Sequence, residues 1–210
     1  MDFIHSRYKL ENLKSAIKEE LYLEPILYYK KDLINEFLKL VNNQEMVLQN
    51  LDPKTNSFQR DIVTLELDRI KYYLKKYFRT RNYKIEKNIL YIFKNDLSRM
   101  LSKAEFDFAV GYYKLLSQQF EEGLFCKVSK KYGEQLFVNN VMEKDRQTSM
   151  SVPIVDNPDE TKYVFVRFLE KVEKLGLDKS VVIEVEKGTI FFVPYKYIKS
   201  LLENGKCVII

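Results

Sequence analysis

The stretch that most constrains the fold covers residues 59–87, QRDIVTLELDRIKYYLKKYFRTRNYKIEK, and contains neither glycine nor proline. Its apolar residues recur at spacings of three and four, which predicts one face of a continuous α-helix. At about 1.5 Å per residue, such a helix is about 40 Å long, more than one small domain needs. The predicted face consists of Val63, Leu67, Ile70, Leu74, Tyr77 and Ile85, with Phe78 beside it and Arg81 on the same side.

The charges of this stretch follow the order that suits a helix dipole, with acidic residues in the first half and basic residues in the second. The basic half allows two interpretations. It could bind phosphates, with interleaved tyrosines stacking on bases. Alternatively, it is a cationic helix end whose arginines pair with acids elsewhere in the bundle or on a partner. Arg79 and Arg81 lie two residues apart and therefore on different faces of a helix, so they cannot serve one groove.

Other periodic segments predict more helices before residue 145. Residues 6–48 favour two helices, the second starting near Pro25, because proline is tolerated in a first helical turn. Residues 88–99 favour another helix. Ser102 and Glu105 have the capping-box spacing at the start of a further helix, whose apolar row we interpret as bundle core. That row is Phe106, Ala109, Tyr113, Leu116, Phe120 and Leu124. A bundle of about five helices is therefore expected.

The composition changes after residue 145. Residues 145–161 are rich in turn formers and have no period, which is typical of a linker. Beyond them we predict strands over residues 163–168, 181–185 and 189–193, the last two forming a hairpin, then a helix over 195–203 and a final strand over 206–210. The chain thus divides into a helical domain (1–145), a linker (146–160) and a small β-rich domain (161–210). This mainly α chain ends on an apolar strand that we expect to rest on a partner.

Residue usage argues against catalysis. The only histidine is His5, the six glycines are scattered, and no phosphate-binding loop is present. We interpret Cys126 and Cys207 as core residues in a reducing compartment. No run of 18 apolar residues occurs, and the first 20 residues lack an apolar core, so neither a membrane span nor a signal peptide is expected. We therefore predict no enzyme activity, no metal and no cofactor.

The segment ELDRIKYYLKKYFRTRNYKIEK resembles the signature helix of the GINS complex subunit of the SLD-five type. In that family a Glu-x-x-Arg-Ile opening precedes Tyr-x-Arg-x-Arg and then Lys-Ile-Glu-Lys. The C-terminal stretch EVEKGTIFFVPYKYIKSLLENGKCVII is similar to the family's Glu-Lys-Gly hairpin, short helix and apolar final strand. The resemblance covers nearly the whole chain and is strongest over residues 60–87 and 161–210.

The resemblance implies a helical A domain, a β-rich B domain and a nuclear, non-catalytic scaffold. It implies a heterotetramer with three other GINS subunits of the PSF family. That tetramer joins the MCM ring and the CDC-forty-five protein in the CMG replicative helicase, which initiates and extends DNA replication, and it links this helicase to DNA polymerase epsilon. Contact with DNA is at most indirect in this picture, and no membrane is involved.

Two functional hypotheses follow. In the first, protein–protein interaction dominates and the subunit interface includes Arg69, Tyr72, Tyr77, Arg79, Arg81, Lys84, Phe191, Tyr195 and Ile210. In the alternative, the basic helix over residues 69–87 binds nucleic acid directly through Arg69, Lys75, Lys76, Arg79 and Lys84.

Overall fold

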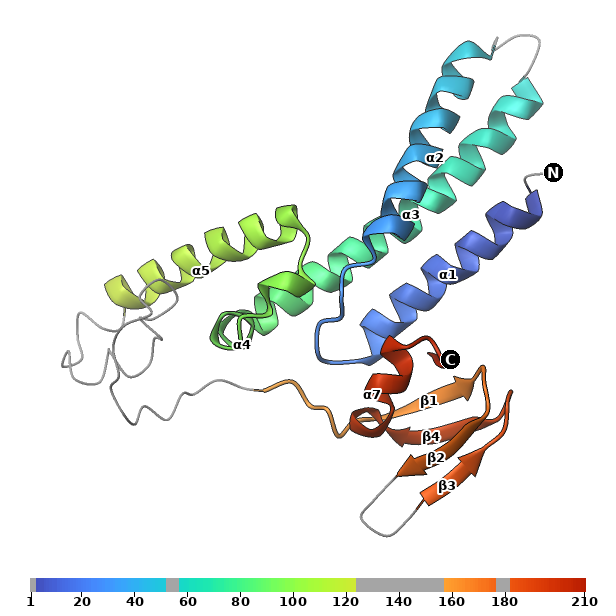
Figure 1. The fold of residues 1–210 in the computed structure, drawn as a ribbon. Helices are drawn as coiled ribbons and strands as arrows, with labels where there is room; N and C mark the ends of the chain where they lie inside the picture. The colour runs from blue at the N-terminus through green and yellow to red at the C-terminus, as the bar shows by residue number, and fades with distance from the viewer. Residues whose placement is uncertain (1–2, 52–56, 124–156, 177–181) are drawn as a thin grey trace. The chain divides into compact units, whose positions relative to one another are not determined.

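The structure is a computed structural model that describes residues 3–51, 57–123, 157–176 and 182–210 of the 210-residue chain (Figure 1). Five α-helices precede the first strand in this part of the chain, and small antiparallel sheets follow, which confirms the predicted fold class. The helical elements are α1 (Phe3–Tyr22), α2 (Lys31–Asn50), α3 (Ser57–Lys87), α4 (Ile89–Lys94), the 3-10 helix η1 (Leu97–Met100) and α5 (Lys103–Gly123). The C-terminal elements are β1 (Tyr163–Phe168), β2 (Val172–Gly176), β3 (Val182–Val185), β4 (Ile190–Pro194), α7 (Tyr195–Glu203) and β5 (Cys207–Ile209).

The chain forms two compact units. The first unit contains residues 1–25, 30–81 and 159–210, and the second contains residues 26–29 and 82–158. Most of the predicted linker over residues 146–160 lies outside the described residues, so the domain boundaries remain predictions. No helix in the described ranges combines the length and apolar character needed to cross a membrane.

Helix α3 confirms the continuous helix predicted from the sequence. It has 31 residues, and the predicted apolar face is the one that is covered. In the first unit, Leu67, Leu74 and Tyr77 are buried, while Val63 and Ile70 are half-buried. The alternation of three and four residues places these side chains on one side of the helix, where neighbouring helices cover them.

The start of α2 corrects the sequence analysis. The helix begins at Lys31 and not near Pro25, and residues 23–30 are not helical. In the second unit, Ile26 is buried and the backbone N–H of Tyr29 donates a hydrogen bond to the carbonyl of Met100 at 3.1 Å. Because burial and backbone pairing satisfy this segment in a non-helical form, the permissive effect of Pro25 on helix formation is overridden.

The helix predicted over residues 88–99 is interrupted. Helix α4 ends at Lys94, and Asp96 adopts the left-handed conformation with φ 50° and ψ 47° before η1 begins. A left-handed residue ends an α-helix, and aspartate is among the few residues that tolerate this conformation. The Ser98 hydroxyl donates a hydrogen bond to the carboxylate of Asp96 at 3.0 Å, which holds the break.

The start of α5 confirms the predicted capping box. The N–H of Ser102 donates to the Glu105 carboxylate at 2.8 Å, and the N–H of Glu105 donates to the Ser102 hydroxyl at 3.3 Å. Ala109, Tyr113 and Leu116 of the row that follows pack into the core of the second unit, as predicted. Phe106, at the start of the row, was wrongly predicted as core, because its side chain is 37% exposed. Phe120 and Leu124 lie outside the described side chains. The buried cluster is Ile26, Ile85, Ile89, Ile92 and Ala109, with Tyr113 and Leu116 packed against it.

The C-terminal strands form two sheets, with strand order β4-β1-β5 in one and β2-β3 in the other. The predicted hairpin between the segments now seen as β3 and β4 is wrong, because β3 pairs with β2, and β4 pairs with β1. The turn between β3 and β4 directs β4 to β1 and not to β3. In this turn the N–H of Gly188, at φ 88°, donates a hydrogen bond to the carbonyl of Phe168 at 2.7 Å, so that β4 begins beside the end of β1. The sequence VEKLG of β2 has no clear alternation, and its strand was not predicted.

Helix α7 covers one face of the three-stranded sheet. Its Tyr195 and Ile198 are buried, as are Val166 and Phe168 of β1 and Ile209 of β5. Gly205 at φ 70° ends the helix, which matches the predicted Asn-Gly cap, and the predicted final strand is confirmed as β5. Helix α1 also packs against β5 in this unit.

Candidate subunit-interaction surfaces

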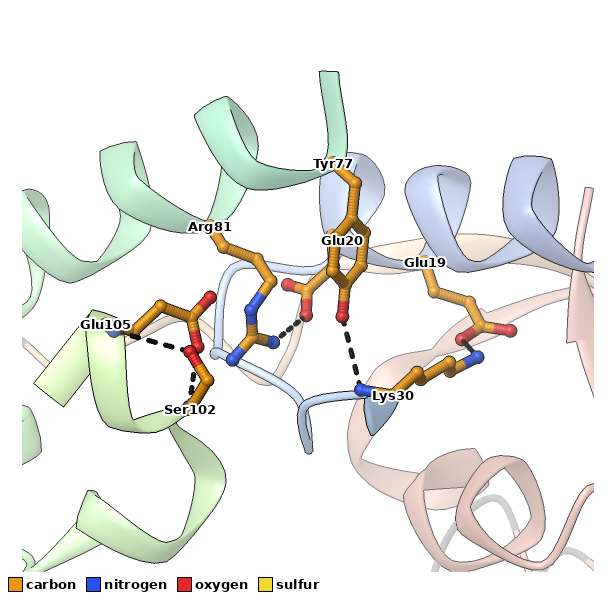
Figure 2. A network of polar contacts seen from close by, with 7 residues as sticks. All are labelled: Glu19, Glu20, Lys30, Tyr77, Arg81, Ser102 and Glu105. Atoms are coloured by element: carbon orange, nitrogen blue, oxygen red, sulfur yellow. Dashed lines mark hydrogen bonds and ion pairs between the residues drawn. The ribbon is translucent and has the colours of Figure 1, made fainter. Parts of the chain in front are cut away.

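A buried ion pair joins α3 to α1. Nη1 of Arg81 donates a hydrogen bond to Oε1 of Glu20 at 2.6 Å, and the side chains are 0% and 2% exposed (Figure 2). The guanidinium also lies 5.7 Å from the centre of the Tyr77 ring. A buried charge is costly unless it is paired, so each member depends on the other. Arg81 therefore acts inside the first unit.

Tyr77 and a second ion pair connect the same region to the start of α2. The backbone N–H of Lys30 donates to the Tyr77 hydroxyl at 3.4 Å, and the Lys30 ammonium lies 2.6 Å from the Glu19 carboxylate (Figure 2). Glu19 directly precedes Glu20 in α1. Helix α1, the start of α2 and helix α3 thus meet at adjacent polar contacts, and these contacts fix the position of α3.

Two ionisable groups of the β-rich part are inert for an electrostatic reason. Burial raises the pKa of Tyr195, and the nearby carboxylates of Glu203 and Glu160 raise it further. Burial, with a smaller effect of Glu19, raises the pKa of the Cys207 thiol to about 12. Both groups stay protonated at neutral pH. A protonated, buried thiol is a poor nucleophile, which agrees with the interpretation of Cys207 as a core residue.

The nine residues predicted at a subunit interface separate into a buried set, one half-buried residue and an exposed set. Four are buried inside the chain: Tyr77, Arg81, Lys84 and Tyr195. Phe191 is half-buried and contacts Phe168, with ring centres 6.1 Å apart. The remaining four are exposed: Arg69, Tyr72, Arg79 and Ile210. A partner can contact the exposed set directly. The buried set holds in place the helix and the sheet that carry the exposed residues.

The exposed set from α3 belongs to a longer row. Phe58, Ile62 and Leu65 precede Arg69 and Tyr72 at alternating spacings of four and three, and Arg79 continues the row one heptad later. We call these six residues the outer stripe. The exposed fractions are 75% for Phe58, 42% for Ile62, 70% for Leu65 and 58% for Tyr72. This stripe lies on the side of α3 opposite to the buried face.

Sequence reasoning missed the first half of the outer stripe and could have found it. The heptad spacing of Phe58, Ile62 and Leu65 was present in the sequence, but in a second register that the stronger stripe of the buried face obscured. The same reasoning chose Phe191 on β4, whereas its neighbour Phe192 is the more exposed side chain, at 54%. No group of three or more His, Cys, Asp and Glu side chains suited to a metal occurs among the described residues.

The fold and its surfaces define a mainly helical subunit with a small β-rich C-terminal part. Residues 158–210 match the family model described as "DNA replication complex GINS protein SLD5 C-terminus", which gives the class: a GINS-type protein.

Comparisons with individual relatives over most of the chain agree with this class. The chain is 31% identical to the DNA replication complex GINS protein SLD5 of Dictyostelium discoideum over 201 residues, covering 94% of this chain and 89% of the relative. It is 28% identical to the protein of the same name from Arabidopsis thaliana over 207 residues, with the same two coverages. The Debaryomyces hansenii protein of that name is 28% identical over 222 residues, covering 95% and 86%. The chain therefore belongs to the SLD5 family of GINS proteins.

Proposed function

We propose that this chain is a non-catalytic scaffold subunit of a nuclear GINS heterotetramer, which it forms with three other GINS subunits of the PSF family. In this role the tetramer is part of the CMG replicative helicase, with the MCM ring and the CDC-forty-five protein, and is linked to DNA polymerase epsilon. It serves initiation and elongation of DNA replication. The proposal rests on membership of the SLD5 family and on the outer stripe. In this proposal the chain consists of a helical A domain (1–145) and a β-rich B domain (161–210).

The outer stripe carries the structural part of this proposal. Phe58 and Leu65 are at least 70% exposed, and burying such a side chain is worth about 1.5–3 kcal/mol. From Phe58 to Arg79 the stripe extends about 32 Å along the helix at about 1.5 Å per residue. Its heptad spacing suits packing against another helix, and its charge suits a partner that is apolar at one end and acidic at the other.

The polar groups inside the chain support a structural and not a catalytic role. Arg81 and Glu20 neutralise each other, and Ser102 and Glu105 cap a helix. In the described part of the chain, every buried side-chain nitrogen and oxygen atom has a hydrogen-bond partner. These groups are committed to holding the fold, which leaves them unavailable for proton transfer or nucleophilic attack.

The nucleic-acid hypothesis has less support, because several basic side chains of α3 are buried or paired with an acid and are not free at its surface. Arg81 and Lys84 are buried, and the Lys71 ammonium lies 2.6 Å from the Glu45 carboxylate of α2. A phosphate-binding helix needs several cations on one face. We therefore assign no second function to α3.

Co-expression tests the proposed function. The chain is produced with the three PSF-type subunits of the same organism, purified through a tag on one PSF subunit, and weighed by native mass spectrometry. We expect a single complex with one copy of each of the four chains, together with aggregation of this chain when it is expressed alone. A stable monomer that does not co-purify with the PSF subunits would contradict the proposal.

A further inference from the structure

The face of the three-stranded sheet that α7 does not cover is apolar and exposed. Along β1, Val164, Val166 and Phe168 are buried, while the alternate residues point to the other side of the sheet. That other side, which we call the outer sheet face, consists of Tyr163, Phe165 and Arg167 of β1, Ile190 and Phe192 of β4, the half-buried Val208 of β5, and Ile210 after β5. Its exposed apolar members are exposed by 56%, 57%, 52%, 54% and 38% in the order Tyr163, Phe165, Ile190, Phe192 and Ile210.

The aromatic rings of this face are already packed together. Phe165 and Phe192 are opposite each other in the β1–β4 register, with ring centres 4.5 Å apart, and the Tyr163 ring lies 5.2 Å from that of Phe192. A partner that binds here therefore loses little entropy in ordering these side chains. Tyrosine, phenylalanine and arginine are also residue types enriched at the centres of protein interfaces.

A cavity of about 380 Å³ adjoins one end of the outer sheet face. Tyr163, Phe192 and Pro194 line it on one side, and Lys196 and Tyr197 of α7 on another. The Lys196 ammonium lies 4.6 Å from the centre of the Tyr197 ring. The cavity can receive one side chain of a partner, and Lys196 supplies a positive charge beside it.

Positive charge flanks the aromatic rings at both ends. Arg167 is the charged residue of the outer sheet face, and it lies at the end of β1 remote from Tyr163 and Lys196. Four residue steps of a strand separate Tyr163 from Arg167, or about 13 Å. A helix covers that distance in about nine residues. The matching surface therefore has apolar side chains in the middle and a carboxylate at each end.

The dimensions and charge favour a helix of another protein over a nucleic acid. Three strands about 4.8 Å apart place the outer two about 10 Å from each other, which is the width of one helix with its side chains. A nucleic-acid surface needs a cation for each of several phosphates, whereas the outer positions of this sheet hold Arg167 among apolar residues.

We propose that the outer sheet face binds an amphipathic helix from a neighbouring subunit of the GINS complex, with apolar residues at three- and four-residue spacing and carboxylates facing Arg167 and Lys196. This inference rests on the proposed function, since it takes the partner from the same assembly. It adds a second contact surface, separate from the outer stripe of α3, and states the chemistry of the segment that fills it.

Photo-crosslinking in the co-expressed complex tests this. The photoreactive amino acid p-benzoylphenylalanine replaces Phe192, and in a control it replaces Lys187, an exposed residue of the turn before β4. After irradiation, mass spectrometry identifies the crosslinked peptide. We expect the Phe192 probe to label a helical, acidic segment of a PSF subunit and the Lys187 probe to give little product. Arg167→Glu in the Phe192-probe background is expected to lower the crosslink yield about two- to fivefold, in line with a partly exposed ion pair. Replacing the facing carboxylate of the partner by lysine restores the yield.

The outcomes separate this inference from the proposed function. An intact tetramer in which the Phe192 probe labels nothing, a second copy of this chain, residues 124–156 of the same chain, or added single-stranded DNA overturns the inference and leaves the tetramer proposal in place. An Arg167→Glu variant with unchanged yield also contradicts it. If no tetramer is found by native mass spectrometry, the proposed function fails, and this inference fails with it.

Discussion

Arg81 of α3 and Glu20 of α1 form a buried ion pair with an N–O distance of 2.6 Å, although 61 positions separate them in the chain. Together with the Tyr77 contact to Lys30, this pair fixes the orientation of α3 in the first unit. The consequence for function is indirect: with one face of α3 held inside, its opposite face presents the outer stripe.

Removing one partner of the buried pair should destabilise the protein strongly. For Arg81→Met we expect a loss of about 3–5 kcal/mol, because the Glu20 carboxylate is left buried without its partner. That corresponds to a fall in Tm of about 6–20 °C for a chain of this size. The measurement is a thermal unfolding scan of the co-expressed complex.

Two further variants check the reason for this loss. Lys75→Ala, at an exposed position of α3 six residues away and outside the outer stripe, should change Tm by no more than about 2 °C. Adding Glu20→Gln to Arg81→Met should recover part of the lost Tm, since it removes the uncompensated charge. If the double variant is less stable than Arg81→Met alone, the loss of stability in Arg81→Met does not come from the unpaired carboxylate of Glu20.

A charge in the outer stripe should prevent assembly without unfolding the chain. Leu65→Glu places a carboxylate at a position that is 70% exposed in the single chain, so the fold tolerates it, but a partner helix cannot bury it. We expect the yield of tetramer to fall at least tenfold by size-exclusion chromatography. Gln59→Glu adds the same charge at an exposed position outside the stripe, and its yield should match that of the unchanged chain.

The Cys207 thiol should be unreactive in the folded protein. Its pKa of about 12 leaves almost no thiolate at pH 8, whereas an unfolded cysteine with a pKa near 8.5 is partly ionised there. In a Cys126→Ser background, a thiol reagent at pH 8 should therefore react at least a hundredfold faster in 8 M urea than in buffer. Equal rates in the two solvents would contradict the burial of Cys207.

The same raised pKa predicts how stability depends on pH. The folded state holds the Cys207 proton up to about pH 12, while the unfolded chain releases it above about pH 8.5. The unfolded state then binds fewer protons, so the free energy of unfolding decreases as the pH rises through this window. Tyr195, with its raised pKa, acts in the same direction. Urea midpoints between pH 8 and pH 10.5 should fall in the Cys126→Ser chain, and fall less when Cys207→Ala is added.

The capping box of α5 makes a local prediction. Ser102→Ala removes the hydroxyl that accepts the Glu105 N–H and should cost about 1 kcal/mol. Hydrogen–deuterium exchange in the first turn of α5 should speed up roughly fivefold. Lys103→Ala, at the exposed next residue, keeps the box and should leave the exchange rate unchanged.

The sequence was informative where a pattern is local and repeated. The apolar spacing of α3 predicted both the length of the helix and the buried side on which Arg81 lies. It could not identify Glu20 as the partner of Arg81, because that contact depends on how α1 packs against α3. The alternation of β1 likewise predicted a strand, but the pairing of β4 with β1 depends on the Gly188 contact to Phe168, and the hairpin prediction failed there.

The errors in the helical part have a common physical origin. Pro25 permits a helix start, and residues 88–99 have helical spacing, but Ile26 is buried in a non-helical segment and Asp96 adopts a left-handed conformation. Both outcomes depend on the core of the second unit and not on local propensity. At the candidate surfaces, periodicity placed Arg69, Tyr72 and Arg79 on α3, but the second heptad register that begins at Phe58 became clear only from exposure.

We expect a partner subunit to cover the outer stripe of α3 when the chain assembles. The most direct measurement places a cysteine at Leu65 in the Cys126→Ser background and compares its rate of alkylation in the free chain, kept soluble at low concentration, with that in the purified tetramer. Cys207 is buried and adds little background. We predict that alkylation slows at least tenfold in the tetramer, while a cysteine at Gln59 reacts equally fast in both. Equal rates at Leu65 in the free chain and in the tetramer would contradict the account.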